Sequence, residues 1–210
     1  LGASLRIVKR IPLGGGLGGG SSDAATTLVA LNRLWGCDLT VERLAGLALT
    51  LGSDVPLFVR GASAWAEGRG EFLTPVELPE RWYVVVHPGV GVPTAQVFQM
   101  PELTRNTPLI TIRAFLAAGG SNDCEPVVRK LHPQVGEALD WLSREPSMDS
   151  ARAPARLTGT GACIFSSHAS AIEAERVAAR VPDRWRSFVA RGVNVSPLVE
   201  RLNSRDVDSE

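Results

Sequence analysis

Six of seven consecutive positions near the start of the chain are glycine, Gly14–Gly16 and Gly18–Gly20, and Ser21 and Ser22 follow them. Glycine loses more backbone entropy on folding than any other residue, so such a cluster needs a compensating role. A glycine loop that leads into a helix presents backbone N–H groups and the positive end of a helix dipole to an anion. The pattern therefore indicates a phosphate-binding loop, with serine hydroxyls for a phosphate oxygen or Mg2+.

Two better-known phosphate loops fit this run poorly. The P-loop pattern needs a lysine after its glycines, whereas Lys9 precedes the run. The dinucleotide pattern is formally matched, but it needs an acidic residue that ends a second strand about 20 residues further on. Asp38 instead precedes a predicted helix. A flexible hinge without ligand stays open as an alternative for the run.

Two further stretches could take part in chemistry. Asp54 lies in the sequence Gly-Ser-Asp-Val-Pro, which is typical of a helix start, and it is either an N-cap or a general base for a hydroxyl that attacks a γ-phosphate. Thr158–Gly161 is a second loop of small residues before an apolar run. It is either an ordinary tight turn or a backbone that packs under the first loop.

Composition bounds the class of protein. The chain has 210 residues, of which 44% are apolar, and 22 Lys and Arg balance 22 Asp and Glu. This excludes global disorder and disfavours a basic nucleic-acid binder, since such proteins carry excess positive charge. No apolar run reaches the roughly 20 residues of a membrane span, and no signal peptide is visible, so we expect no membrane partner. The three cysteines are far apart, which disfavours disulfides and a protein-held metal site and favours a reducing, cytoplasmic setting.

The elements that must position these residues alternate irregularly, which predicts an α+β fold rather than a doubly wound parallel sheet. Strands are predicted at about 6–11, 62–66, 71–74, 82–87, 162–166 and 187–195. Helices are predicted at about 21–35, 40–51, 95–100, 109–118, 122–131, 134–144 and 170–180. The polar end from 201 to 210 is expected to fray.

Taken together, these sequence features resemble those of one known protein family. Residues 12–25 resemble the glycine-rich ATP loop of the GHMP kinases. Five later stretches, in the same order, resemble the members that act on 4-diphosphocytidyl-2-C-methyl-D-erythritol: 49–56, 86–89, 93–98, 121–125 and 157–163. The resemblance extends from about Ile7 to Leu198, and six motifs in one order argue against a chance match.

The resemblance implies a GHMP kinase two-domain fold. We expect an incomplete N-terminal α+β domain over 1–78, a ferredoxin-like C-terminal domain over 79–200 and a flexible tail over 201–210. The implied activity is phosphorylation of the 2-hydroxyl of 4-diphosphocytidyl-2-C-methyl-D-erythritol in the non-mevalonate route to isoprenoid precursors. The implied cofactors are ATP and Mg2+, and the implied partners are ATP and this cytidine diphosphate-linked alcohol.

The resemblance also assigns roles to residues. Asp54 would be the catalytic base, and Thr94 and Phe98 would line the substrate side, with Phe98 stacked on the cytosine ring. Thr158–Gly161 would support the active site. The expected ATP-binding residues are Pro12, Leu13, Gly14, Gly15, Gly16, Leu17, Gly18, Gly19, Gly20, Ser21 and Ser22.

One departure and two alternatives accompany the resemblance. Family enzymes carry a Pro-Ala-Lys-Leu-Asn type motif whose lysine pairs with the catalytic aspartate, and no stretch of this sequence matches it. We therefore expect the chain to be a fragment of a longer kinase with an incomplete sheet and little turnover by itself. The alternatives are a homoserine- or mevalonate-type kinase, which the aromatic Phe98 disfavours, and an inactive nucleotide-binding protein.

Overall fold

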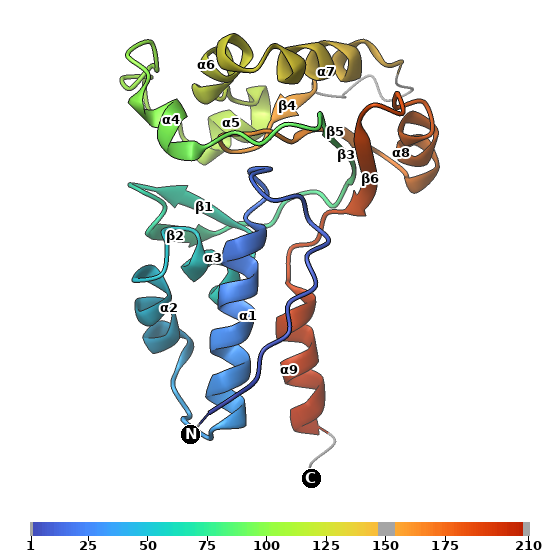
Figure 1. Cartoon of the computed structure of the whole chain (residues 1–210). Helices are drawn as coiled ribbons and strands as arrows, with labels where there is room; N and C mark the ends of the chain where they lie inside the picture. Colours follow the sequence, from blue (N-terminus) through green and yellow to red (C-terminus); the bar gives the residue numbers. More distant parts are fainter. Residues whose placement is uncertain (1, 147–153, 208–210) are drawn as a thin grey trace. The chain divides into compact units, whose positions relative to one another are not determined.

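Two units of the computed structural model are assembled from interleaved parts of the chain (Figure 1). Residues 2–146 and 154–207 are described by the structure. Unit 1 consists of Leu1–Arg10, Gly18–Glu80 and Val193–Glu210, and unit 2 consists of Ile11–Leu17 and Arg81–Gly192. The glycine run is thus divided, because the chain passes from unit 2 to unit 1 between Leu17 and Gly18.

Unit 2 contains a four-stranded antiparallel sheet in the order β4-β5-β3-β6. The strands are β3 (Trp82–His87), β4 (Arg156–Leu157), β5 (Ile164–His168) and β6 (Arg186–Arg191). Alternate residues of a strand point to opposite faces of a sheet. Val84, Val86 and Ile164 share one face and are completely buried. This face therefore forms the floor of the unit's apolar core.

The helices of unit 2 are α4 (Thr94–Gln99), α5 (Ile112–Ala118), α6 (Cys124–Leu131), α7 (Pro133–Arg144) and α8 (Ala171–Ala178). α7 packs on β5 through core residues that include Leu139 and Leu142, and α8 packs on β3 and β6. The predicted helix start at Ser170 is confirmed, since its hydroxyl caps α8 by accepting a hydrogen bond from the Glu173 N–H at 3.2 Å.

Unit 1 is mainly helical. It contains α1 (Gly19–Leu34), α2 (Val41–Leu49), α3 (Val55–Arg60), α9 (Pro197–Val207) and an antiparallel pair, β1 (Ala64–Glu67) and β2 (Phe72–Pro75). Ala25, Leu44 and Val55 contribute to a core between α1, α2 and α3, which Leu198 of α9 also contacts. The Thr40 hydroxyl caps α2, as its position before Val41 predicts.

The mixture of helices and antiparallel strands confirms the predicted α+β class. None of the helices in residues 2–146 and 154–207 combines the length and apolar character needed to cross a membrane. The division into domains at residues 78 and 200 stays a prediction about the family domains. The two units described above differ from these predicted domains, because the residues from Val193 onwards belong to unit 1.

Some local predictions are wrong. The stretch 6–11 forms no strand, and the Ile7 and Val8 side chains are 57% and 68% exposed. A strand needs a hydrogen-bonded neighbour, and no described segment pairs with this one. At the other end, α9 extends from Pro197 to Val207 and residues 208–210 lie outside the described part, so the flexible tail expected over 201–210 stays a prediction. The short strand β4 was not predicted, because only two residues pair.

Candidate active site

The second half of the glycine run begins α1 in unit 1. Gly18 is the N-cap with φ 66° and ψ 15°, a left-handed conformation that favours glycine. A Cβ on Gly18 would lie 2.7 Å from Cζ of Phe58, so the site also has no room for a larger residue. The helix therefore begins at Gly19, two residues before the predicted serine cap, and Ser21 lies inside its first turn.

The start of α1 is suited to an anion. The first amides of a helix have no partner within it. No side chain caps the N-terminus of α1, and its first turn carries no acidic residue. Asp23, the next carboxylate along the helix, is paired with the ammonium of Lys9. The amides of this turn and the helix dipole therefore present positive charge that no first-turn carboxylate offsets.

The first half of the glycine run is held in unit 2 by the second small-residue loop. The Gly14 carbonyl accepts a hydrogen bond from the Ala162 N–H, and the Gly15 carbonyl accepts one from the Cys163 N–H, both at 3.0 Å. The Gly16 carbonyl accepts one from the Thr158 hydroxyl at 2.7 Å. The carbonyls of three successive residues therefore accept hydrogen bonds from the second loop.

Close packing explains why glycine is needed where the two loops meet. Gly16 has φ +71°, and a Cβ there would lie 2.2 Å from the Thr158 carbonyl oxygen and 2.9 Å from that of Gly161. A Cβ on Gly15 would lie 2.8 Å from Sγ of Cys163. Both interpretations of Thr158–Gly161 agree with the structure: the Gly161 N–H donates to the Thr158 carbonyl at 2.8 Å and closes a tight turn, and this turn packs against the first loop.

Cys163 lies beneath the glycine run as a buried, free thiol. Burial raises its pKa to about 12, so the thiol is uncharged near neutral pH and fills space beside Gly15. A reactive cysteine needs an accessible thiolate. Cys163 is therefore a packing residue of the loop junction.

The predicted substrate residues lie together on α4 of unit 2. The Thr94 hydroxyl is 2.9 Å from that of Thr160, which links the start of α4 to the second loop. Phe98 is 55% exposed, which leaves its ring available for stacking. The guanidinium of Arg105 donates to the carbonyls of Phe98, at 2.6 Å, and Met100, and so holds the end of this short helix. No sequence pattern predicts this role for Arg105, because its contacts arise from the fold of the loop that follows α4.

Asp54 lies in unit 1, at the N-cap position of α3. Its backbone is right-handed helical and its side chain makes no capping hydrogen bond, so the capping role considered for it is not observed. One carboxylate oxygen, Oδ1, is 3.3 Å from the Ser53 hydroxyl, and the side chain is exposed. The carboxylate is therefore available for a proton, while Thr94 and Phe98 belong to the other unit.

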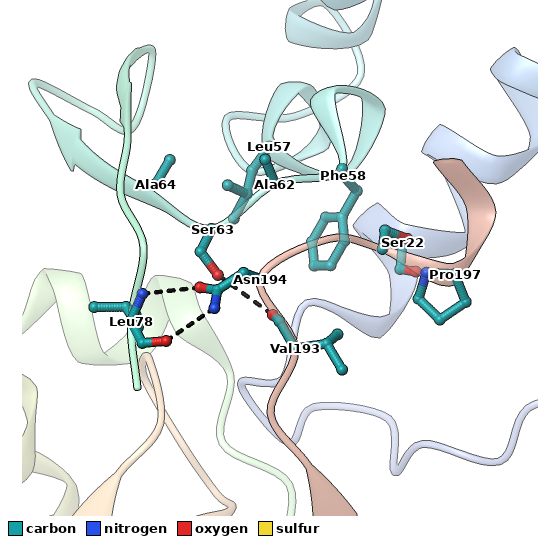
Figure 2. Close-up of a pocket in the computed structure, with 12 residues that line it drawn as sticks. Ser22, Leu57, Phe58, Ala62, Ser63, Ala64, Leu78, Val193, Asn194 and Pro197 are labelled. Carbon is teal, nitrogen blue, oxygen red and sulfur yellow. Dashed lines mark hydrogen bonds between the residues drawn. The ribbon is translucent and has the colours of Figure 1, made fainter. Parts of the chain in front are cut away.

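An apolar pocket of about 460 Å³ lies in unit 1 beside the first turn of α1 (Figure 2). Phe58 and Ser22 line it. The amide of Asn194 pairs with both the N–H and the carbonyl of Leu78, at 2.9 and 2.8 Å, and the Ser63 hydroxyl donates to the Val193 carbonyl. These polar groups therefore join segments of the chain at the pocket wall. The sequence did not predict this pocket.

No group of three or more His, Cys, Asp or Glu side chains is placed to hold a metal ion within residues 2–146 and 154–207. Magnesium commonly binds through few protein groups together with substrate phosphates.

Comparison with known proteins identifies the family. The family model described as "GHMP kinases N terminal domain" matches residues 1–62, and that described as "GHMP kinases C terminal" matches residues 102–187. A curated 4-diphosphocytidyl-2-C-methyl-D-erythritol kinase of Chromohalobacter salexigens is 54% identical over 98% of this chain, which spans 68% of the relative's length. The chain belongs to the GHMP kinase family.

Solved structures agree with this assignment. A crystal structure of 4-(cytidine 5'-diphospho)-2C-methyl-D-erythritol kinase matches with a TM-score of 0.72 and 34% identity, covering 87% of this GHMP kinase chain and 68% of the other chain. A homoserine kinase from Cytophaga hutchinsonii matches with a TM-score of 0.59 at 18% identity, covering 90% and 69% of the two chains. The second likeness concerns the fold alone.

Because the two loops are in contact at Gly16, alanine at Gly16 and alanine at Gly14 should lower the free energy of unfolding by different amounts in the protein without nucleotide. Gly14 and Gly16 both have positive φ, but a Cβ on Gly14 has no contact closer than 3.7 Å. Gly14→Ala should lower the free energy of unfolding by roughly 1–2 kcal/mol through backbone strain alone. Gly16→Ala should cost at least twice as much, because the loops must separate as well. Urea unfolding of both variants measures the difference, and equal losses would contradict the described contact.

Proposed function

We propose that the protein transfers the γ-phosphate of ATP to the 2-hydroxyl of 4-diphosphocytidyl-2-C-methyl-D-erythritol. The observation that carries this proposal is the glycine run, whose carbonyls at Gly14–Gly16 are engaged by a second loop while its last glycines begin α1. Such an arrangement leaves backbone amides for phosphate oxygens. The 54% identity to a kinase named for this substrate supports the choice of alcohol.

In this proposal, Pro12 to Ser22 bind the phosphates of ATP. The first-turn amides of α1 supply donors, and the pairing of Asp23 with Lys9 reduces repulsion from that carboxylate. Gly20 suits close approach, because a Cβ there would meet no atom within 4 Å apart from the neighbouring backbone of its own helix. The space that a side chain would occupy at Gly20 is thus available to a ligand.

The residues present are compatible with Mg2+ bound mainly by the ATP phosphates. The hydroxyls of Ser21 and Ser22 stand in the first turn of α1, and the described residues offer no cluster of acidic ligands that would hold the ion alone. Hydroxyl and phosphate oxygens are ligands that Mg2+ prefers. When bound, the ion supplies positive charge that offsets the negative charge of the phosphates.

Asp54 acts as the general base in this mechanism. Its carboxylate accepts the proton of the substrate's 2-hydroxyl while the hydroxyl oxygen forms a bond to the γ-phosphorus and the bond from that phosphorus to the β,γ-bridging oxygen breaks. ADP leaves with the bridging oxygen, and the product is a phosphate monoester. The support for this role is a carboxylate that is exposed and makes no capping hydrogen bond.

Thr94 and Phe98 bind the alcohol substrate. An exposed aromatic ring can stack on a nucleobase, which contributes about 1–3 kcal/mol per base in nucleic-acid complexes. A homoserine substrate has no ring to stack on Phe98, which is 55% exposed. We therefore favour the diphosphocytidyl alcohol over a short aliphatic substrate.

Removal of the proposed base should abolish turnover without weakening nucleotide binding. In the intact gene product, Asp54→Asn should lower kcat by about 10²–10⁴-fold, because the amide cannot take the proton. Transfer of labelled γ-phosphate to the diphosphocytidyl alcohol measures the rate, and calorimetric titration with ATP measures the affinity. Asp38→Asn is the matched control, since asparagine tolerates the φ of 49° at that position. An unchanged kcat in Asp54→Asn would contradict the assignment.

A second test concerns the phosphate site itself. Gly20 in α1 and Gly46 in α2 are both helical glycines at which a Cβ meets no protein atom within 4 Å. Alanine at either position should leave the free energy of unfolding unchanged or higher, by up to about 1 kcal/mol. Only Gly20→Ala should weaken ATP binding, by about tenfold or 1.4 kcal/mol. Equal ATP affinities in the two variants would show that the phosphates do not approach Gly20.

A further inference from the structure

Asn122 joins the second loop to the start of α6 through three hydrogen bonds. Its side-chain amide donates to the carbonyl of Leu157 at 3.1 Å and to that of Gly159 at 2.8 Å. Its side-chain oxygen accepts from the Cys124 N–H at 3.0 Å. Both donors and the oxygen of this side chain are therefore used, and the two carbonyls that it holds flank Thr158.

Thr158 is in turn the residue that contacts the glycine run. Its hydroxyl donates to the Gly16 carbonyl at 2.7 Å, its N–H donates to the Cys163 carbonyl at 3.0 Å, and its carbonyl accepts from the Gly161 N–H at 2.8 Å. The close approach of Gly16 to this residue leaves no space for a Cβ. A shift of Thr158 would therefore displace Gly16.

We propose that Asn122 is a positioning residue for the phosphate loop, acting through Thr158 on Gly16. The proposal rests on the proposed function in one respect, because it takes the glycine run to be the ATP site. Asn122 does not touch ATP in this scheme. It fixes the two carbonyls beside Thr158, and thereby the position at which Gly16 is held. All the residues in this chain of contacts belong to unit 2.

The chemistry requires an amide at this position. Asn122→Asp keeps an oxygen for the Cys124 N–H but replaces both donors with a carboxylate oxygen, which repels the carbonyls of Leu157 and Gly159. Asn122→Ser retains one donor on a shorter side chain. The two variants thus weaken the same contacts to different degrees, and the serine variant keeps the test possible if the aspartate variant does not fold.

The chain offers a matched control in Asn32. The Asn32 amide donates to the Leu39 carbonyl at 3.2 Å, and its oxygen accepts from the Leu39 N–H at 3.0 Å. Asn32→Asp therefore makes the same chemical change at a side chain in the last turn of α1 that also bonds to backbone groups. A loss that reflects lower stability alone should occur in both variants.

The experiment compares these variants in the intact gene product by calorimetric titration with ATP and by steady-state kinetics. Asn122→Asp should weaken ATP binding and raise the KM for ATP by about tenfold, with less than a twofold change in the KM for the diphosphocytidyl alcohol. Asn122→Ser should give a smaller effect of the same kind. Asn32→Asp should leave both KM values within twofold of the wild type.

Three results would overturn the inference. If Asn122→Asp binds ATP as tightly as the wild type, then Asn122 does not position the loop. If Asn122→Asp does not fold, the same result in Asn122→Ser has this meaning. Equal losses of ATP affinity in the Asn122 and Asn32 variants would show a general effect of stability. A wild-type protein that does not bind ATP would refute the proposed function as well, and this result is distinct from the other two.

Discussion

The contact between the glycine run and the loop at residues 158–163 is the constraint on which the site depends. Gly14, Gly15 and Gly16 each direct a carbonyl to a donor of the second loop. Carbonyl oxygens that faced a phosphate would repel it, so their engagement by the protein leaves amides as the groups available to an anion. Glycine loses much backbone entropy on folding, and the close backbone packing gives a reason for this loss beside the proposed approach of a ligand.

The residues of the proposed site are divided between the two units. Unit 1 contains the amides that begin α1, which no side chain caps, and the carboxylate of Asp54, which makes no capping hydrogen bond. Unit 2 contains the second loop, which supports the first half of the glycine run, and the side chains of Thr94 and Phe98. The glycine run belongs to both units, because the chain passes from one to the other between Leu17 and Gly18.

The sequence predicted features that depend on neighbouring residues. The caps at Thr40 and Ser170 are correct because a hydroxyl and an amide three residues apart decide them. The strand expected at 6–11 is wrong because pairing depends on a distant segment. The role of Asn122 was not predicted for the same reason, since its partner Gly159 is 37 residues away. The glycine run and Asp54 were found as candidates because the residue types themselves carry the signal, while the contacts that support the run were visible only in the structure.

Hydrogen exchange at Ala162 and Cys163 tests the central contact most directly. Their amides donate to the carbonyls of Gly14 and Gly15, so exchange requires the two loops to separate. We expect slow exchange of both amides in the protein without nucleotide, at rates near those of the β5 amides, and slower exchange still when ATP is added. Exchange at the rate of an unstructured peptide, unaffected by ATP, would contradict it.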